Sequence, residues 1–124
     1  MWERVLVVAL GGALGALARY GVSGVIDEWR GPTVLAIFAV NITGTLLLGL
    51  FLGVTEGRFS APYLARPAIA IGFLGAYTTF STVMFETVDL AESRSFVAAS
   101  LNAGGSLVVG LLAMYAGLAL GRSV

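Results

Sequence analysis

Cysteine, histidine and lysine are all absent from this 124-residue chain, and these absences remove whole classes of function. Without thiols or imidazoles there is no disulfide, no thiol nucleophile, no imidazole acid–base catalysis and little to bind a transition metal. We therefore do not expect an enzyme. The seven basic residues are all arginines scattered along the chain, which argues against nucleic acid as a partner and against a polybasic lipid anchor.

Charge of either sign is also scarce, and long apolar runs take its place. Only 11% of residues are charged and 58% are hydrophobic, whereas a soluble domain carries about 25% charged residues. Crossing about 30 Å of hydrocarbon takes about 20 apolar residues in a helix. Four stretches qualify, and they predict an all-α membrane protein with one four-span domain over residues 1–124. The predicted spans are about 5–26, 33–54, 64–90 and 95–120.

The N-terminus begins like a signal peptide, but its apolar sequence continues past Gly11 without a break. We interpret it as a retained span. Four spans place both termini and the loop after the second span on one side of the membrane. That side collects Arg4, Arg58, Arg66 and Arg122, against Arg30, Arg94 and, with less certain placement, Arg19. The bias is weak; it fits either a chain with few loops or a protein that inserts in both orientations.

Small residues dominate the first predicted span. Gly11 and Gly15 form a G-x-x-x-G motif, which allows two membrane helices to approach closely. The motif fits packing inside one subunit or between subunits. Because four short helices can scarcely enclose a pathway alone, we expect a homo-oligomer.

The third predicted span is interrupted by a polar run, Gly75-Ala76-Tyr77-Thr78-Thr79-Phe80-Ser81-Thr82. Unsatisfied backbone groups in hydrocarbon cost several kcal/mol, so irregular backbone at membrane depth needs protein, water or an ion as a partner. We expect the third helix to be broken here, at the first place to look for function.

Other polar residues lie at membrane depth in the first, second and fourth spans. Arg19 either serves an aqueous vestibule that draws in anions or extends to the interface. Asn41 either joins helices or lines a pathway. In the fourth span, Asn102, Ser106 and Gly110 are four residues apart and share one face, as interhelical contacts or as a polar track for a desolvating ion.

An aromatic residue in a membrane helix usually faces lipid or the protein core, but Phe80 has hydroxyl side chains as neighbours in the sequence, which favours a functional role. A phenyl ring has a positive edge, so Phe80 with neighbouring hydroxyl groups can receive a small anion without a fixed charge. Conduction needs such weak binding at several sites. Val83 shares the face of Phe80, and Glu86 follows near the interface.

These motifs together resemble the Fluc (CrcB) fluoride channel family over all four spans. They are Gly11-Gly12-x-x-Gly15-Ala16-x-x-Arg19-Tyr20, then Val40-Asn41-x-x-Gly44 with Gly49, then Gly75-x-x-Thr78-Thr79-Phe80-Ser81-Thr82 and Glu86. The resemblance implies an antiparallel, dual-topology homodimer with two fluoride pores and a structural Na⁺ at the dimer interface. It also implies passive fluoride export across the plasma (inner) membrane of a microbial cell.

The resemblance also assigns residues. Phe80, Asn41 and Ser106 match pore positions, with Thr79 and Ser81 beside them, and Arg19 matches a vestibule arginine. The backbone carbonyls of Gly75 and Thr78 would hold Na⁺. Two positions depart from the family pattern. Val83 stands where relatives have a second phenylalanine, for which Phe85 is a possible substitute, and Asn102 stands where relatives often have tyrosine.

Two other functions fit four spans. A proton-coupled exporter resembling the small multidrug transporters would need an acidic residue in the first span, and residues 5–26 contain none. An assembly subunit without transport activity would need only the glycine-rich helices. The polar stripe and the expected break in the third span argue against it.

Overall fold

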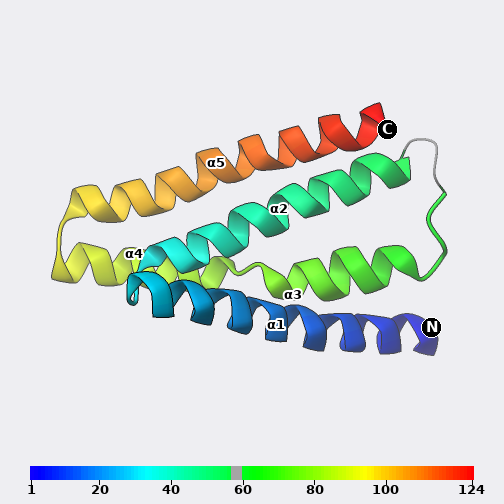
Figure 1. Ribbon diagram of the computed structural model, residues 1–124, viewed down its shortest axis with the longest axis horizontal. Helices are drawn as coiled ribbons and strands as arrows, with labels where there is room; N and C mark the ends of the chain where they lie inside the picture. Colours follow the sequence, from blue (N-terminus) through cyan, green and yellow to red (C-terminus); the bar gives the residue numbers. More distant parts are fainter. Residues whose placement is uncertain (57–59) are drawn as a thin grey trace.

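The computed structural model describes residues 1–56 and 60–124, and helices account for nearly all of them. The helices are α1 (Trp2–Arg30), α2 (Val34–Glu56), η1 (Arg66–Leu74), α3 (Gly75–Tyr77), α4 (Phe80–Ser93) and α5 (Phe96–Ser123). Figure 1 shows them side by side along the long axis, with both chain termini at one end. Arg58 lies outside the described residues.

Four of these helical segments are long and apolar enough to cross a membrane, η1 to α4 counting as one segment, Arg66–Ser93. The predicted all-α class and four membrane-spanning helices are confirmed. Each helix is longer at its C-terminal end than the predicted span, because charged residues such as Glu28 and Arg30 continue α1 beyond the apolar core. The assignment of residues 1–124 to a single domain stays a prediction.

Helices α2 and α5 pack with their backbones in close contact, and glycines make this possible. A Cβ atom on Gly49 would lie 2.6 Å from the Met114 carbonyl oxygen, and one on Gly53 would lie 2.7 Å from that of Leu118. From the other side, Gly121 faces the carbonyl of Leu50. Any larger residue at these positions would separate the two helices.

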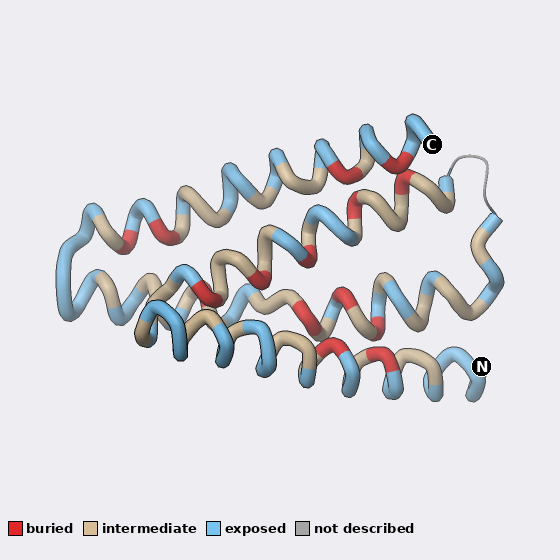
Figure 2. The backbone as a smooth tube through the Cα atoms, viewed as in Figure 1, coloured by how far each residue is buried: buried red, intermediate tan, exposed pale blue. Residues whose placement is uncertain are grey.

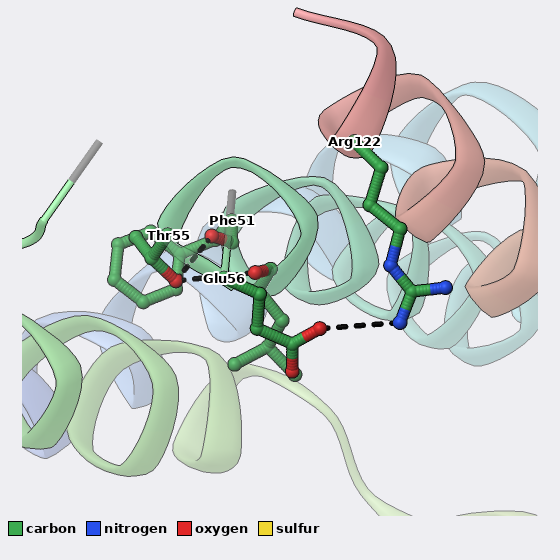
Figure 3. A network of polar contacts seen from close by, with 5 residues as sticks. Phe51, Thr55, Glu56 and Arg122 are labelled. Carbon is green, nitrogen blue, oxygen red and sulfur yellow. Dashed lines mark hydrogen bonds and ion pairs between the residues drawn. The ribbon is translucent and has the colours of Figure 1, made fainter. Parts of the chain in front are cut away.

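An ion pair joins the same two helices at their ends. A guanidinium nitrogen of Arg122 lies 3.1 Å from a carboxylate oxygen of Glu56 (Figure 3). The two side chains are 60% and 44% exposed, so the pair contributes at most about 1 kcal/mol. Glycine packing, rather than charge, holds α2 and α5 together.

The G-x-x-x-G motif of α1 packs against η1. A Cβ atom on Gly11 or Gly15 would collide with the backbone carbonyl of Ala68 or Phe73, and one on Gly72 would lie 2.9 Å from the Val8 carbonyl. Of the two readings of this motif, the structure therefore supports packing inside one subunit. The expectation of a homo-oligomer gains nothing from it.

The third membrane segment is broken after Tyr77, as expected, and its halves have different neighbours. Helices η1 and α3 pack against α1, whereas α4 packs against α5. The first half, η1, is a π-helix, a feature that was not expected from the sequence. Such helices are rare and occur often at functional sites.

Few side chains are buried within the single chain. The buried hydrophobic residues are Ala36, Val40, Leu74, Tyr77, Val83 and Ala99. Figure 2 shows the buried positions as short, separate segments of the helices, with most of the tube intermediate or exposed. Large apolar side chains cover the outside, for example Leu6 at 61% and Leu112 at 64% exposed. In water such an exposed apolar surface would favour aggregation, but in a bilayer it is the surface that contacts lipid.

Candidate ion pathway at the break of the third helix

The chain is extended at two residues where the third segment breaks. Thr78 has φ −81° and ψ 155°, and Thr79 has φ −148° and ψ 117°. The Thr79 hydroxyl then accepts the Thr82 amide at 3.3 Å and caps the start of α4. The break frees backbone groups at membrane depth, so each needs another partner.

Asn41 of α2 supplies two of these partners. Its side-chain oxygen accepts the Thr79 amide at 2.7 Å, and its side-chain nitrogen donates to the Thr79 carbonyl at 3.0 Å. Arg19 of α1 donates to the Thr78 carbonyl at 3.1 Å. The break is thus held from both sides, by α1 and by α2. The prediction that the polar run needs partners is confirmed.

A cavity of 390 Å³ lies beside the break, between α2, α4 and α5. Asn41, Thr45, Thr78, Thr79 and Ser106 supply its polar lining, and none of them carries a charge. The Ser106 hydroxyl oxygen is buried and has no hydrogen-bond partner within residues 1–56 and 60–124. A buried hydroxyl without a partner is free to donate to a guest in the cavity.

Phe80 and Val83 complete one wall of the cavity, in different ways. Val83 is only 6% exposed, whereas Phe80 is 77% exposed. The valine belongs to the packed core of the subunit. The phenylalanine borders the cavity but extends outward, where its ring has room for another contact.

Five of the seven residues predicted to line the pore meet around this cavity: Asn41, Thr79, Phe80, Val83 and Ser106. The other two, Ser81 and Asn102, lie elsewhere. Ser81 is exposed and hydrogen-bonds the Thr79 hydroxyl at 3.2 Å, and Phe85 is 72% exposed on the outer surface.

Asn102 is also separate from this cavity. It is 8% exposed and donates to the Thr87 hydroxyl at 3.1 Å. The predicted stripe of Asn102, Ser106 and Gly110 is therefore divided: only Ser106 and Gly110 border the cavity beside Phe80. The contact of Asn102 with Thr87 joins α5 to α4.

Sequence reasoning missed some residues of the lining. Thr45 borders the cavity, and its position four residues after Asn41 on the same helix face was the signal that would have indicated it. Met84 and Met114 fill the apolar side. The role of Tyr77 was also not predicted. Its hydroxyl lies 3.1 Å from that of Thr43, and this hydrogen bond connects the residue before the break to α2.

The two carbonyls predicted to hold a cation have different surroundings. The Thr79 amide, which would bond the Gly75 carbonyl in an unbroken helix, goes to Asn41. The Gly75 carbonyl is thereby released. The Thr78 carbonyl accepts Arg19 and keeps a second lone pair. Over the described parts of the chain, His, Cys, Asp and Glu form no group of three or more that could hold a metal.

Comparison with known proteins identifies the family. Residues 6–118 match the family described as CrcB-like protein, Camphor Resistance (CrcB). A protein of Nitratidesulfovibrio vulgaris named fluoride-specific ion channel FluC is 42% identical over 123 residues, covering 98% of this chain and 99% of that protein. One of Acidobacterium capsulatum with the same name is 44% identical over 122 residues, covering 98% of each. From these matches along nearly its whole length, the chain belongs to the CrcB-like family of membrane proteins.

Proposed function

We propose that this chain is a passive, fluoride-selective ion channel that exports fluoride from the cell and relieves its toxicity. Relatives that match it end to end are named fluoride-specific ion channels. The observation that carries the proposal is the cavity beside the helix break, whose polar groups are all uncharged. A channel has no covalent chemistry to perform, which agrees with the expectation that the chain is not an enzyme.

The lining supports rapid anion passage because each contact is weak. Ser106 offers a hydroxyl proton, Thr79 lines the same cavity, and the edge of the Phe80 ring carries partial positive charge. Together they replace water around a small anion without binding it as tightly as an arginine would. Fluoride then enters and leaves readily. In this mechanism Asn41 keeps the Thr79 backbone in position and also faces the cavity.

The pathway needs a second subunit, and we propose an antiparallel homodimer of dual topology in the plasma membrane. Phe80 is 77% exposed on one chain, so a second copy is required to enclose the ring and close the pathway. The nearly balanced distribution of arginines favours insertion in both orientations. Arg19, which contacts the break in one chain, would add positive potential at a vestibule beside it.

A structural Na⁺ at the centre of this dimer is part of the same proposal. Hard cations prefer oxygen ligands, and the released Gly75 carbonyl and the second lone pair of Thr78 are of that kind. Two carbonyls from each subunit would supply a set of four without any carboxylate. The ion would contribute a positive charge between the subunits and hold them together.

The proposal is tested with purified protein in liposomes loaded with fluoride and monitored with a fluoride electrode. We expect fast efflux without a proton gradient and no efflux of chloride. Phe80→Ile should reduce the flux at least about tenfold, because an aliphatic side chain has no positive edge, with the dimer intact by size-exclusion chromatography. Efflux only in exchange for protons would overturn the channel in favour of an exporter.

Neither alternative function gains support from a specific observation. The first span still lacks an acidic residue at membrane depth, since Asp27 and Glu28 fall in the last turn of α1. An assembly subunit would have no need of a buried hydroxyl without a partner at Ser106.

A further inference from the structure

We propose that the groove between α1 and η1 binds one anionic phospholipid, with its phosphate between Arg4 and Arg66 and an acyl chain along the groove. This α1–η1 groove has a volume of 620 Å³, and Arg4, Arg66 and Tyr63 border it together with Val5, Val8 and Ile71. It is separate from the cavity beside Phe80, and the proposal is independent of which ion the protein conducts.

Charge is the first reason for an anionic headgroup. Arg4 and Arg66 bring two positive charges to one groove from two different helices. Within residues 1–56 and 60–124, the only ion pair is the one between Arg122 and Glu56. In this part of the chain, therefore, no carboxylate forms an ion pair with Arg4 or Arg66. Glu3 precedes Arg4, but adjacent residues on a helix point in different directions. Two such guanidinium groups match a phosphate diester, to which arginine binds in bidentate geometry.

Tyr63 fixes the position of one of these charges. The guanidinium carbon of Arg4 lies 4.3 Å from the centre of the Tyr63 ring. Because the guanidinium group lies over the face of the ring, it is attracted to the tyrosine, and its N–H donors that point away from the ring stay free for an anion. The site is therefore partly organised before a ligand arrives.

The length of α1 and the aromatic residues at its N-terminal end indicate that the groove lies at the level of the lipid headgroups. At 1.5 Å per residue, the 29 residues of α1 extend about 43 Å, well beyond the hydrocarbon core. Arg4 is in its first turn, next to Trp2, which is 81% exposed, and Tyr63 at the same end is 62% exposed. Exposed tryptophan and tyrosine mark the membrane–water interface. A lipid phosphate and these two arginines therefore share one level.

The walls of the groove explain why the ligand is a lipid and not a free phosphate. Val5, Val8 and Ile71 form an apolar surface below the arginines, with Val5 53% and Ile71 64% exposed. An acyl chain extending from the headgroup covers this surface, whereas inorganic phosphate leaves it open. The ligand thus has an anionic head and an apolar tail.

A second apolar groove also has an arginine at its border, but carboxylates lie near that arginine. Arg94 borders a groove of 430 Å³ between α2, α4 and α5. The same arginine also borders a cavity that contains Asp27, Glu86 and Asp89. These carboxylates repel an anionic headgroup, so we expect selectivity for anionic lipid at the α1–η1 groove only.

Native mass spectrometry of the delipidated, full-length protein tests the proposal with added phosphatidylglycerol or phosphatidylcholine. We expect phosphatidylglycerol to be retained at least about tenfold more strongly, because two arginines near the membrane surface attract an anionic headgroup. Arg4→Gln and Arg66→Gln should each reduce the preference, and the double variant should abolish it. Arg122→Gln, at the same end of the molecule but outside the groove, is the matched control and should keep the preference.

Two further measurements separate head from tail. Ala9→Phe, which fills the groove and leaves both arginines in place, should weaken retention of phosphatidylglycerol about tenfold. Excess sn-glycerol 3-phosphate should displace the lipid poorly. Equal retention of both lipids by the unaltered protein, an unchanged preference in a double variant of normal helicity, or full displacement by glycerol phosphate would each overturn the proposal.

Discussion

Asn41 is the residue on which the local geometry of the break depends most directly. It acts as donor and acceptor to the same residue, Thr79, at 3.0 and 2.7 Å. From the sequence, a contact between helices and a pathway ligand were alternatives for this asparagine. In the structure it touches the backbone of the break and also borders the cavity.

Replacing Asn41 by alanine should cost about 1–3 kcal/mol of stability and most of the fluoride flux, because the partly buried amide and carbonyl of Thr79 lose their partners. Thermal unfolding in detergent and liposome efflux measure the two effects. Asn102→Ala is the matched control: it removes one bond to a hydroxyl, for which about 0.6 kcal/mol is expected. Equal losses in both variants would contradict the special role of Asn41.

Val83 is one of the two positions at which the resemblance implies a departure from the family pattern, and its burial defines a second prediction. The side chain is 6% exposed but borders the 390 Å³ cavity. We expect Val83→Phe to lower the free energy of unfolding by less than about 3 kcal/mol, because the added ring can extend into the cavity. Fluoride flux should rise, since a second ring edge is added. Val83→Leu adds bulk without an aromatic edge, and an equal rise with leucine would exclude the edge as the cause.

At the scale of the helix, the break at Thr78 and Thr79 allows the two halves of one membrane segment to pack against different helices. Its first half packs against α1 and its second half against α5. The glycines of α1 and α2 make close contacts with η1 and α5, respectively, and they carry the packing that polar bonds do not.

Gly117→Ala tests the packing of α5 on α2. An added Cβ would collide with the Leu46 carbonyl and lie 2.8 Å from the Leu50 amide nitrogen, so we expect a loss of about 1–3 kcal/mol. Gly24→Ala in α1 is the control, because nothing lies within 4 Å of a Cβ there. It should be neutral or stabilise by up to about 1 kcal/mol. Thermal unfolding in detergent compares the two, and equal stability would contradict tight packing at Gly117.

For the whole molecule, the structure shows which charges share a membrane side. The N-terminus, the start of η1 and the C-terminus lie at one end, which carries Arg4, Arg66 and Arg122, while Arg30 and Arg94 lie at the other (Figure 1). Arg19 contacts the break between the two ends. Among the described residues the difference is thus small, and it gives little reason for a single orientation.

Topology can be measured directly because the chain has no cysteine. Ser123→Cys places one thiol in the last turn of α5. With a membrane-impermeant thiol reagent added to intact spheroplasts, we expect about half of the protein to react, the rest reacting only after permeabilisation. Complete labelling from one side, or none, would contradict dual topology.

The sequence predicted the number and rough limits of the membrane segments, the break and most of the polar residues that line the cavity, since each depends on local polarity. It did not predict the π-helix of η1, the division of the stripe at Asn102, or the contact of Arg19 with the Thr78 carbonyl. These features depend on which helices become neighbours. A motif such as Gly11 and Gly15 allows close packing but does not specify which helix packs against it.

The exchange of neighbours at the break also has a mechanical consequence. Helix α1 with η1, and helix α2 with α5, are in close backbone contact through glycines, so we expect each pair to move as a rigid unit. The two extended residues, Thr78 and Thr79, form the joint between the first pair and α4, which packs against α5. Stress from a change in bilayer thickness or tension should concentrate at this joint and be transmitted to Phe80, the next residue. Lipid thickness should therefore alter the conduction rate more than the stability of the fold.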